Sequence, residues 1–319
     1  SGWYLYIFNL EMAHRGLPVP VVTLNTVGPA LAKVGTEEQK KEFLPKILRG
    51  EIDISIGYTE PDAGTDLASL KTRAVRDGDY YVINGQKVFT TGAHQADYVW
   101  LACRTDPDAP KHRGISLLLV PLDAEGIEIH PFHMMTGGRT NITYYNDVRV
   151  PVSALVGEEN RGWYYMTTQL DFERVAISPI PQIERGIFDR VCELFRTESV
   201  GEDEEWTRVM LASMAADVNM LKVMDLKAAW TVASGEVPVA EASMLKVLSN
   251  ELRLELLGDT LQMLGSTGLI RKGSPGVLAD SRRAPFGSQR LDAVINLFGG
   301  GNNDIQRDIM ATRGLGLPR

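Results

Sequence analysis

The alternation of hydrophobic and polar positions divides the chain into a helical beginning, a β-rich middle and a long helical end. An apolar run over residues 3–13 predicts a first helix. A second helix is predicted to begin at Thr36-Glu37-Glu38-Gln39, which is typical of a capping box, and to end near Gly50. Beyond residue 158, long periodic segments with short connections indicate an antiparallel bundle. Its helices are expected over roughly 163–196, 205–234, 239–264, 289–298 and 304–313.

The middle of the chain, from about residue 52 to residue 150, has the pattern of short strands. Runs of β-branched and aromatic residues, such as 80–83 and 115–120, are separated by turn signals such as Asp77-Gly78-Asp79. Asn84-Gly85 lies between residues 80–83 and 87–90 and predicts the tight turn of a β-hairpin. These features indicate a compact all-β domain, either a small barrel or a sandwich.

Composition narrows the possible functions and locations. The 319 residues carry a net charge of −8 and present no basic face, which argues against a nucleic-acid partner. No apolar stretch reaches the roughly 20 residues that a membrane span needs. Cys103 and Cys192 lie far apart, and neither they nor the histidines have the spacing of a metal site, so we expect no metal and a reducing cytoplasm. No signal peptide is visible, and the N-terminal part is expected to be incomplete because Ser1-Gly2 opens directly into an apolar helix.

Two polar motifs carry the first chemical signal. Residues 57–66 read Gly-Tyr-Thr-Glu-Pro-Asp-Ala-Gly-Thr-Asp, and residues 84–92 read Asn-Gly-Gln-Lys-Val-Phe-Thr-Thr-Gly. Each motif alone is typical of an ordinary turn or hairpin. Together and in this order they resemble the middle domain of the acyl-CoA dehydrogenase family, where a T-E-P-x-A-G-[ST]-D loop precedes an N-G-x-K-x-[WF]-x-T strand. The resemblance extends over essentially the whole chain, to Gly-Asn-Asn-Asp-Ile-Gln-Arg at residues 301–307.

The family resemblance implies an α+β fold of several domains and a cofactor. Residues 1–51 would be the remainder of a helical N-terminal domain, residues 52–152 a middle β-barrel domain, and residues 153–319 a C-terminal four-helix bundle. The implied cofactor is FAD, the substrate an acyl-CoA, and the electron acceptor an electron-transfer flavoprotein.

The resemblance also implies which residues of the β-domain contact the flavin. Thr59 would hydrogen-bond the edge of the isoalloxazine ring, and Thr91 would contact the same ring system. Phe89 would cover one flavin face, where many relatives have Trp. Tyr58 belongs to the same strand end as Thr59 and is expected at the flavin as well.

Other positions of the family pattern concern the substrate and the far end of the cofactor. Thr65 and Arg174 match positions that meet the acyl-CoA. Gln262 and Gly265 match a Q-x-x-G segment through which a neighbouring subunit holds the FAD pyrophosphate. The Arg of an R-x-x-F-G motif has no match here, because residues 195–205 are acidic instead. That departure argues against two-site FAD binding by this chain alone.

The catalytic base of the family is expected on a helix in this chain. Many relatives carry a Glu in a loop near the C-terminus, at the position of Gly300. Others carry it in an L-x-x-E-R sequence on the first long C-terminal helix, which is matched here by residues 170–174 and places the base at Glu173. The Gly300 backbone N–H would still polarise the thioester carbonyl. The plain alternative for Glu173 is a surface acid paired with a nearby Arg.

Further departures resemble a heteromeric branch of the family. Gly299-Gly300-Gly301, Pro179 and Pro181 after the proposed base, and the sequence of residues 144–151 resemble the base-carrying subunit of actinobacterial steroid-side-chain dehydrogenases. Those enzymes pair two homologous subunits in an α2β2 tetramer; a homotetramer is the other possibility. The two prolines would kink the helix and widen the acyl cavity for a bulky ring system. The alternatives in function are a non-catalytic subunit that helps hold FAD, and a flavin oxidase or monooxygenase on the same fold.

Overall fold

The computed structural model describes most of the chain as two compact units. The described residues are 2–14, 17, 20–176, 180–197, 205–236, 238–270, 274–276 and 285–318, and the description of residues 2, 5, 13, 14, 171–176 and 180–182 is limited to the backbone. One unit, here called the β unit, spans residues 19–176. The other, here called the helical unit, combines residues 1–18 with residues 177–319. The α+β fold class is confirmed. The division at residues 51/52 and 152/153 stays a prediction.

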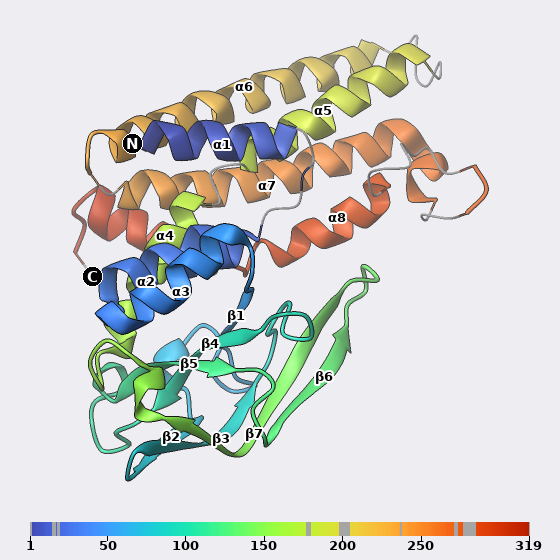
Figure 1. Cartoon of the computed structure of the whole chain (residues 1–319). Coiled ribbons are helices and arrows are strands. Elements are labelled where there is room, and N and C mark those ends of the chain that lie inside the picture. Colours follow the sequence, from blue (N-terminus) through green and yellow to red (C-terminus); the bar gives the residue numbers. More distant parts are fainter. Residues whose placement is uncertain are drawn as a thin grey trace. The chain divides into compact units, whose positions relative to one another are not determined.

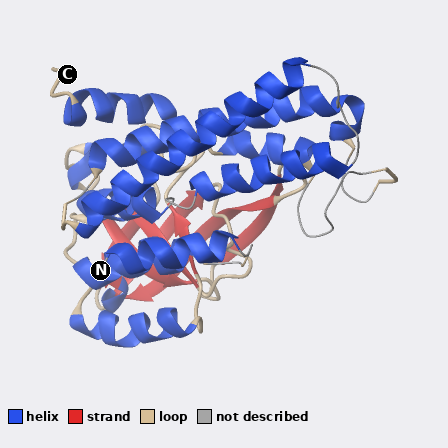
Figure 2. Ribbon diagram, turned by 90° about the horizontal axis from the view of Figure 1, so that it is seen from above, coloured by secondary structure: helices blue, strands red, loops and turns tan. Residues whose placement is uncertain are grey.

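The β unit is built on one eight-stranded sheet, ordered β6-β7-β3-β2-β4-β5-β8, with β1 paired in parallel to β4. Figure 2 shows these strands (red) gathered in a single sheet. Most neighbours are antiparallel, and β2 and β4 meet in parallel at a single residue pair. The strands are β1 (Ile54–Gly57), β2 (Arg73–Asp77), β3 (Tyr80–Lys87), β4 (Tyr98–Arg104), β5 (Ile115–Pro121), β6 (Ile127–His133), β7 (Arg139–Pro151) and β8 (Leu155–Val156).

The central strands β4 and β5 are buried on both faces. In β4, Trp100 belongs to a core that includes Leu31 and Phe43 of the neighbouring helices. The alternate residue Leu101 points to a second core, which contains Tyr145 of β7. A strand covered on both sides needs a continuous apolar run rather than an alternating one, which explains the apolar sequence of β4 and β5. The sheet therefore separates a core under the helices from a core formed largely by residues of β3, β4, β5 and β7.

Helices of the β unit cover one side of this sheet (Figure 1). The capping box predicted at Thr36 is confirmed: the Gln39 N–H donates to Thr36 Oγ1 over 3.2 Å, and the Thr36 N–H donates to Gln39 Oε1 over 3.1 Å. Gly50 ends that helix with φ +66°, a conformation that favours glycine. The helices are the π-helical segment Val22–Val27, α2 (Gly28–Val34), α3 (Glu37–Arg49) and α4 (Gly162–Ala176).

The hairpin predicted at Asn84-Gly85 is wrong. Both residues lie inside β3, and the hairpin turn falls instead at Gly78, between β2 and β3. Asn84-Gly85 forms an irregularity in the pairing of β3 with β7, where Asn84 bonds the side chain and backbone of Asp147. At Gly85 a Cβ atom would lie 2.7 Å from the Thr72 backbone, so the glycine allows a close crossing of strands. The same dipeptide therefore serves a bulge here, not a turn.

The single helix predicted over 163–196 is described as two helices. One is α4, which ends at Ala176 in the β unit, and the other is α5 (Ile180–Thr197), which belongs to the helical unit. The kink predicted at Pro179 and Pro181 lies outside the described residues and side chains, so it stays a prediction.

The helical unit is organised around α7, which packs against α5, α6, α8 and α9. Figure 1 shows α5, α6 and α7 side by side, with α1 packed on α5 and α6. Tyr6 of α1 hydrogen-bonds Asp225 of α6. Burial of the Tyr6 hydroxyl, and to a smaller extent the nearby Asp225 carboxylate, raises the pKa of Tyr6 to about 12. Among the described residues, every helix is too short or too polar to span a membrane. The helices are α1 (Gly2–His14), α5, α6 (Glu205–Ala233), α7 (Val239–Leu264), α8 (Phe286–Ile295) and α9 (Asn303–Ile309).

Candidate active site

The fold brings the two sequence motifs together. The first motif leaves β1 at Gly57, and the second occupies the end of β3. The Val88 N–H of the second motif donates to the Thr59 carbonyl of the first over 2.9 Å. Two segments about thirty residues apart in the chain are therefore neighbours in space.

A buried ion pair joins the same two motifs from within. Lys87 Nζ lies 2.8 Å from Glu60 Oε1, and these side chains are 0% and 7% exposed. Burial opposes ionisation of Glu60, but Lys87 and the hydrogen bonds from Thr72 outweigh it, so the pKa of Glu60 lies below its ordinary value. Burial lowers the pKa of Lys87, an effect that Glu60 opposes. The short contact and the satisfied carboxylate support a charged pair.

Tyr58 connects the first motif to helix α4. Its hydroxyl donates to Gln169 Oε1 over 3.1 Å and accepts from the Trp100 indole N–H over 2.9 Å. Gln169 Nε2 in turn donates to Thr26 Oγ1 over 2.9 Å. The Tyr58 side chain is thus buried in the core, and its predicted contact with the flavin stays a prediction. This chain of bonds fixes α4 against the loop that contains Thr59.

The second motif presents an aromatic surface beside hydroxyl groups. Phe89 is 57% exposed and meets Phe132 edge to face, with ring centroids 5.8 Å apart. Thr91 is exposed, and its Oγ1 lies 3.0 Å from Thr140 Oγ1. Phe89 has φ +58°, a left-handed conformation that costs a residue with a side chain about 1–2 kcal/mol. Strain of this kind at an exposed aromatic residue is typical of functional sites.

The residues present fit a flavin. An isoalloxazine ring offers two flat apolar faces and a polar edge with several hydrogen-bonding atoms. Exposed Phe89 matches the faces, and the hydroxyls of Thr91 and half-buried Thr59 match the edge. Thr65 lies in the exposed continuation of the first motif, where a longer ligand has access.

The predicted base and its neighbour lie on α4. Glu173 and Arg174 belong to the last turns of this helix, and their side chains lie outside the described residues. Residue 173 follows Gln169 by one helical turn, so both occupy the same face of α4. Since Gln169 bonds Tyr58, this is the face of α4 that turns toward the first motif.

The remaining predicted residues lie in the helical unit. Gln262 is exposed in the last turn of α7, and Gly265 caps this helix with φ +56° and ψ −140°. These angles are reached almost exclusively by glycine, which explains the residue type at position 265. Gln262 and Gly265 are thus close along an exposed helix end, as a Q-x-x-G ligand segment requires.

Gly300 lies in a loop that α7 holds in place. Lys246 donates to the Leu297 carbonyl over 3.2 Å and to Asn303 Oδ1 over 2.7 Å, and Gln306 Nε2 donates to the Gly300 carbonyl over 3.3 Å. Burial lowers the pKa of Lys246 to about 8. Gly300 itself has φ +68°, where a side chain would be strained. The loop is therefore shaped by polar contacts around a backbone that favours glycine.

Comparison with known proteins decides the family. Models of the acyl-CoA dehydrogenase N-terminal, middle and C-terminal domains match residues 3–51, 55–148 and 160–315. The chain belongs to the acyl-CoA dehydrogenase family. It is therefore an oxidoreductase that acts on CH–CH groups, as the resemblance predicted.

Individual relatives of this dehydrogenase cover nearly its whole length. Acyl-CoA dehydrogenase FadE26 of Mycobacterium tuberculosis is 46% identical, over 98% of this chain and 80% of its own. The solved Tcur3481–Tcur3483 steroid ACAD is 46% identical with a TM-score of 0.93, over 98% of this chain and 81% of that one. The ChsE4–ChsE5 complex from Mycobacterium tuberculosis is 46% identical with a TM-score of 0.90, over 100% of this chain and 83% of that one. The predicted resemblance to steroid-side-chain enzymes is confirmed.

Sequence reasoning missed Glu60, Lys87 and Gln169 as site residues of the dehydrogenase. All three are buried and hydrogen-bonded to the two motifs. A signal was present for Lys87: Tyr81, Ile83 and Lys87 share the inward side of β3, and a Lys at an inward position requires a buried partner. The partner that could have been predicted for Lys87 is Glu60, an acid inside the other motif.

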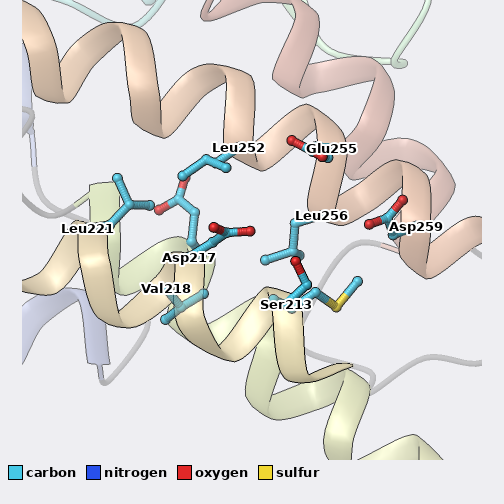
Figure 3. A pocket seen from close by; sticks show the side chains of 10 residues that line it. Ser213, Asp217, Val218, Leu221, Leu252, Glu255, Leu256 and Asp259 are labelled. Atoms are coloured by element: carbon cyan, nitrogen blue, oxygen red, sulfur yellow. The ribbon is translucent and has the colours of Figure 1, made fainter. Parts of the chain in front are cut away.

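The helical unit of the dehydrogenase also contains a small acidic cavity between α5, α6 and α7. Its volume is about 20 Å³, room for one water molecule, and Figure 3 shows Asp217, Glu255 and Asp259 around it. Glu184 lines it from α5, fully buried, and accepts from Arg253 Nε over 2.7 Å. Among the described residues, no three acids, histidines or cysteines are arranged to hold a metal ion, so the cavity offers no metal site.

Glu184 is expected to make the stability of the helical unit pH-dependent. Burial raises its pKa from 4.5 to about 7, although Arg253 opposes the rise. The contribution of Glu184 to the free energy of unfolding is therefore fully present below pH 4.5, and it is lost as the pH rises through about 7. Glu184→Gln should remove a fall in unfolding free energy on the order of 2–3 kcal/mol across this window, measured by denaturant titrations at several pH values. Glu255→Gln, on the exposed rim, is the control; equal slopes for wild type and Glu184→Gln would contradict the assignment.

Proposed function

We propose that this protein catalyses the FAD-dependent α,β-dehydrogenation of a bulky acyl-CoA thioester, with Glu173 as the base. The observation that carries the proposal is the register of α4. Gln169 bonds Tyr58 beside Thr59, and residue 173 follows one turn later on the same face. We therefore expect an acid at this position to approach the loop that we assign to the flavin edge.

The reaction sets clear requirements for the residues. A thioester α-C–H is a weak acid, so a base must be aligned with it while donors polarise the carbonyl. Glu173 would take the α-proton, and the assignment of the Gly300 N–H as a carbonyl donor rests on the family pattern. Thr65 and Arg174 would hold the acyl-CoA.

Several residues would hold the cofactor. Thr59 and Thr91 would bond the polar edge of the isoalloxazine, and Phe89 would cover a face. Gln262 and Gly265 would contact the pyrophosphate of a neighbouring subunit's FAD. FAD, when bound, would supply the acceptor for the hydride of the β-carbon, and an electron-transfer flavoprotein would then take up the electrons.

A steroid side-chain thioester is the proposed substrate. Its support is the 46% identity to a solved protein described as a steroid ACAD, over 98% of this chain. The test is anaerobic titration of the purified flavoprotein with acyl-CoA thioesters, monitored by loss of flavin absorbance. We expect a steroid-CoA to bleach the flavin and a short straight-chain acyl-CoA to bleach it far less. Bleaching by neither would contradict the proposal and favour a non-catalytic FAD-holding subunit.

A homologous subunit is the proposed partner, in an α2β2 assembly. Two of the solved relatives, the Tcur3481–Tcur3483 steroid ACAD and the ChsE4–ChsE5 complex, are named for two proteins each. An exposed row of apolar residues along α6 supports it. The residues Val209, Ala216, Met220, Val223 and Trp230, here called the apolar stripe, follow one another at intervals of three, four and seven. This heptad-like spacing aligns them on one side of the helix, as in a helix–helix interface. Val223 and Trp230 are 65% and 61% exposed, which leaves large apolar surfaces for a partner helix.

Charges in the apolar stripe should dissociate the assembly. Val223→Asp with Trp230→Asp is expected to weaken association by about a hundredfold or more, because both would bury an unpaired carboxylate. Light scattering after size-exclusion chromatography gives the mass of the assembly. Lys222→Asp, at an exposed position about 100° around the helix from Val223, is the control. A variant with the mass of the wild-type assembly would exclude the stripe as an interface.

A further inference from the structure

We infer that the buried Glu60–Lys87 pair is a positioning device for the flavin site. It holds the first motif against the end of β3 so that Thr59 stands in one fixed orientation beside Phe89 and Thr91. The inference rests on the proposed function, because it assigns those three residues to a flavin. It adds to that function two residues that need not touch the cofactor.

Lys87 acts on both sides of Thr59. Its ammonium donates to the Tyr58 carbonyl over 3.0 Å and to Glu60 Oε1 over 2.8 Å. The residues before and after Thr59 are thus bound to one buried group, and the Val88 N–H bonds Thr59's own carbonyl. A loop held at three consecutive residues has little freedom to rotate. The contacts of Lys87 and Val88 therefore fix the direction of the Thr59 side chain.

Glu60 ties this arrangement to a third segment. Its Oε2 accepts from the Lys71 N–H over 2.6 Å, and its Oε1 accepts from the Thr72 N–H over 2.8 Å. Both carboxylate oxygens are therefore satisfied, by an ammonium and by two backbone donors ahead of β2. Such a fully bonded buried charge favours one geometry over all others, because any other would leave a charge unpaired in the core.

The second motif is fixed in a similar way. The Thr90 N–H donates to the Asn141 carbonyl over 3.0 Å, and Asn141 Nδ2 donates back to the Thr90 carbonyl over 2.9 Å. Thr90 is buried, whereas its neighbours Phe89 and Thr91 are exposed. Both motifs are thus held by backbone and buried groups. The side chains of Thr59, Phe89 and Thr91, which we assign to the flavin, are not used in these contacts and can bind it.

The test separates positioning from mere stability. Lys87→Met alone leaves Glu60 buried and unpaired, and it is expected to destabilise the chain. Lys87→Met with Glu60→Met removes both charges and should be more stable than Lys87→Met alone, since it leaves no unpaired charge in the core. The control is Lys71→Met, which removes an exposed lysine 4.0 Å from Asp62 in the same loop region.

Two measurements are made on the assembled protein, with its partner subunit where one co-purifies. FAD is titrated into flavin-free protein, and amide hydrogen exchange is followed over residues 57–66 and 87–92 without flavin. We expect the double variant to bind FAD about tenfold or more weakly and to exchange faster in both segments, while Lys71→Met matches the wild type. A double variant with wild-type FAD affinity and exchange would overturn the inference. Wild-type protein that binds no FAD would instead contradict the proposed function, and this inference with it.

Discussion

Glu173→Gln is expected to lower the turnover of a steroid-CoA by about 10²- to 10⁴-fold, the usual contribution of a positioned general base. The amide keeps the size of the side chain and its hydrogen-bonding capacity but cannot take the α-proton. Binding of the thioester should therefore change little while kcat falls. Steady-state assays with an artificial electron acceptor measure both quantities.

Asp171→Asn is the matched control for this prediction. Residue 171 lies two positions earlier on α4, about 200° around the helix from residue 173 at ~100° per residue, so it should not share the cavity with the base. The Asp171→Asn substitution removes the same charge from the same helix as Glu173→Gln does. A loss of kcat equal to that of Glu173→Gln would point to the charge of α4 and not to proton transfer.

Lys87→Met is expected to lower the free energy of unfolding by about 3–5 kcal/mol, because it leaves the Glu60 carboxylate in the core without its cation. Denaturant unfolding at neutral pH measures this loss. Glu60 should also make the free energy of unfolding of the wild type depend on pH. Its pKa lies below the ordinary 4.5 in the folded chain, so its contribution is present above that pH and is lost as the pH falls through the lowered pKa.

In the Lys87→Met variant this acid-side loss should disappear, since Glu60 no longer has an ammonium to lower its pKa. Arg49 and Glu51 provide a contrast, because they form an exposed ion pair whose removal should change the unfolding free energy far less than Lys87→Met does. A Lys87→Met variant as stable as the wild type would mean that the buried pair contributes nothing to the fold.

Local signals in the sequence predicted several helices of this protein well, although α4 and α5 were predicted as one helix and α2 was not predicted. Helix α7 (Val239–Leu264) begins and ends at the predicted residues, and α6 ends within one residue of its prediction. The capping box at Thr36 explains why the start of α3 was predictable, since both of its hydrogen bonds join residues three apart. The residues that determine where such a helix begins all lie within a short segment of the sequence, so the sequence of that segment is enough to predict it.

Non-local contacts decided the features that the sequence did not predict. Asn84-Gly85 has the composition of a hairpin turn, but Asp147 and Thr72 determine that it is a bulge, and both are distant in the chain. The Glu60–Lys87 pair was likewise visible only as two residues inside separate motifs. Its partners become evident once β3 is seen to turn Lys87 inward.

The candidate site divides in the same manner. The residue types at Thr59, Phe89 and Thr91 were predictable from family motifs, and the fold adds that Phe89 is strained and exposed while Tyr58 is buried. The role of Glu173 depends on which face of α4 turns toward Tyr58, and the Gln169–Tyr58 contact that decides this joins residues 111 apart in the chain.

The most direct measurement of the central claim is α-proton exchange in deuterated water. An acyl-CoA analogue with sulfur at the β-position can lose its α-proton but cannot transfer a hydride, so exchange reports proton removal alone. We expect wild-type holoenzyme to exchange the α-proton of this analogue, Asp171→Asn to do so equally, and Glu173→Gln to show no exchange above the protein-free rate. Undiminished exchange by Glu173→Gln would contradict the assignment of Glu173 as the base.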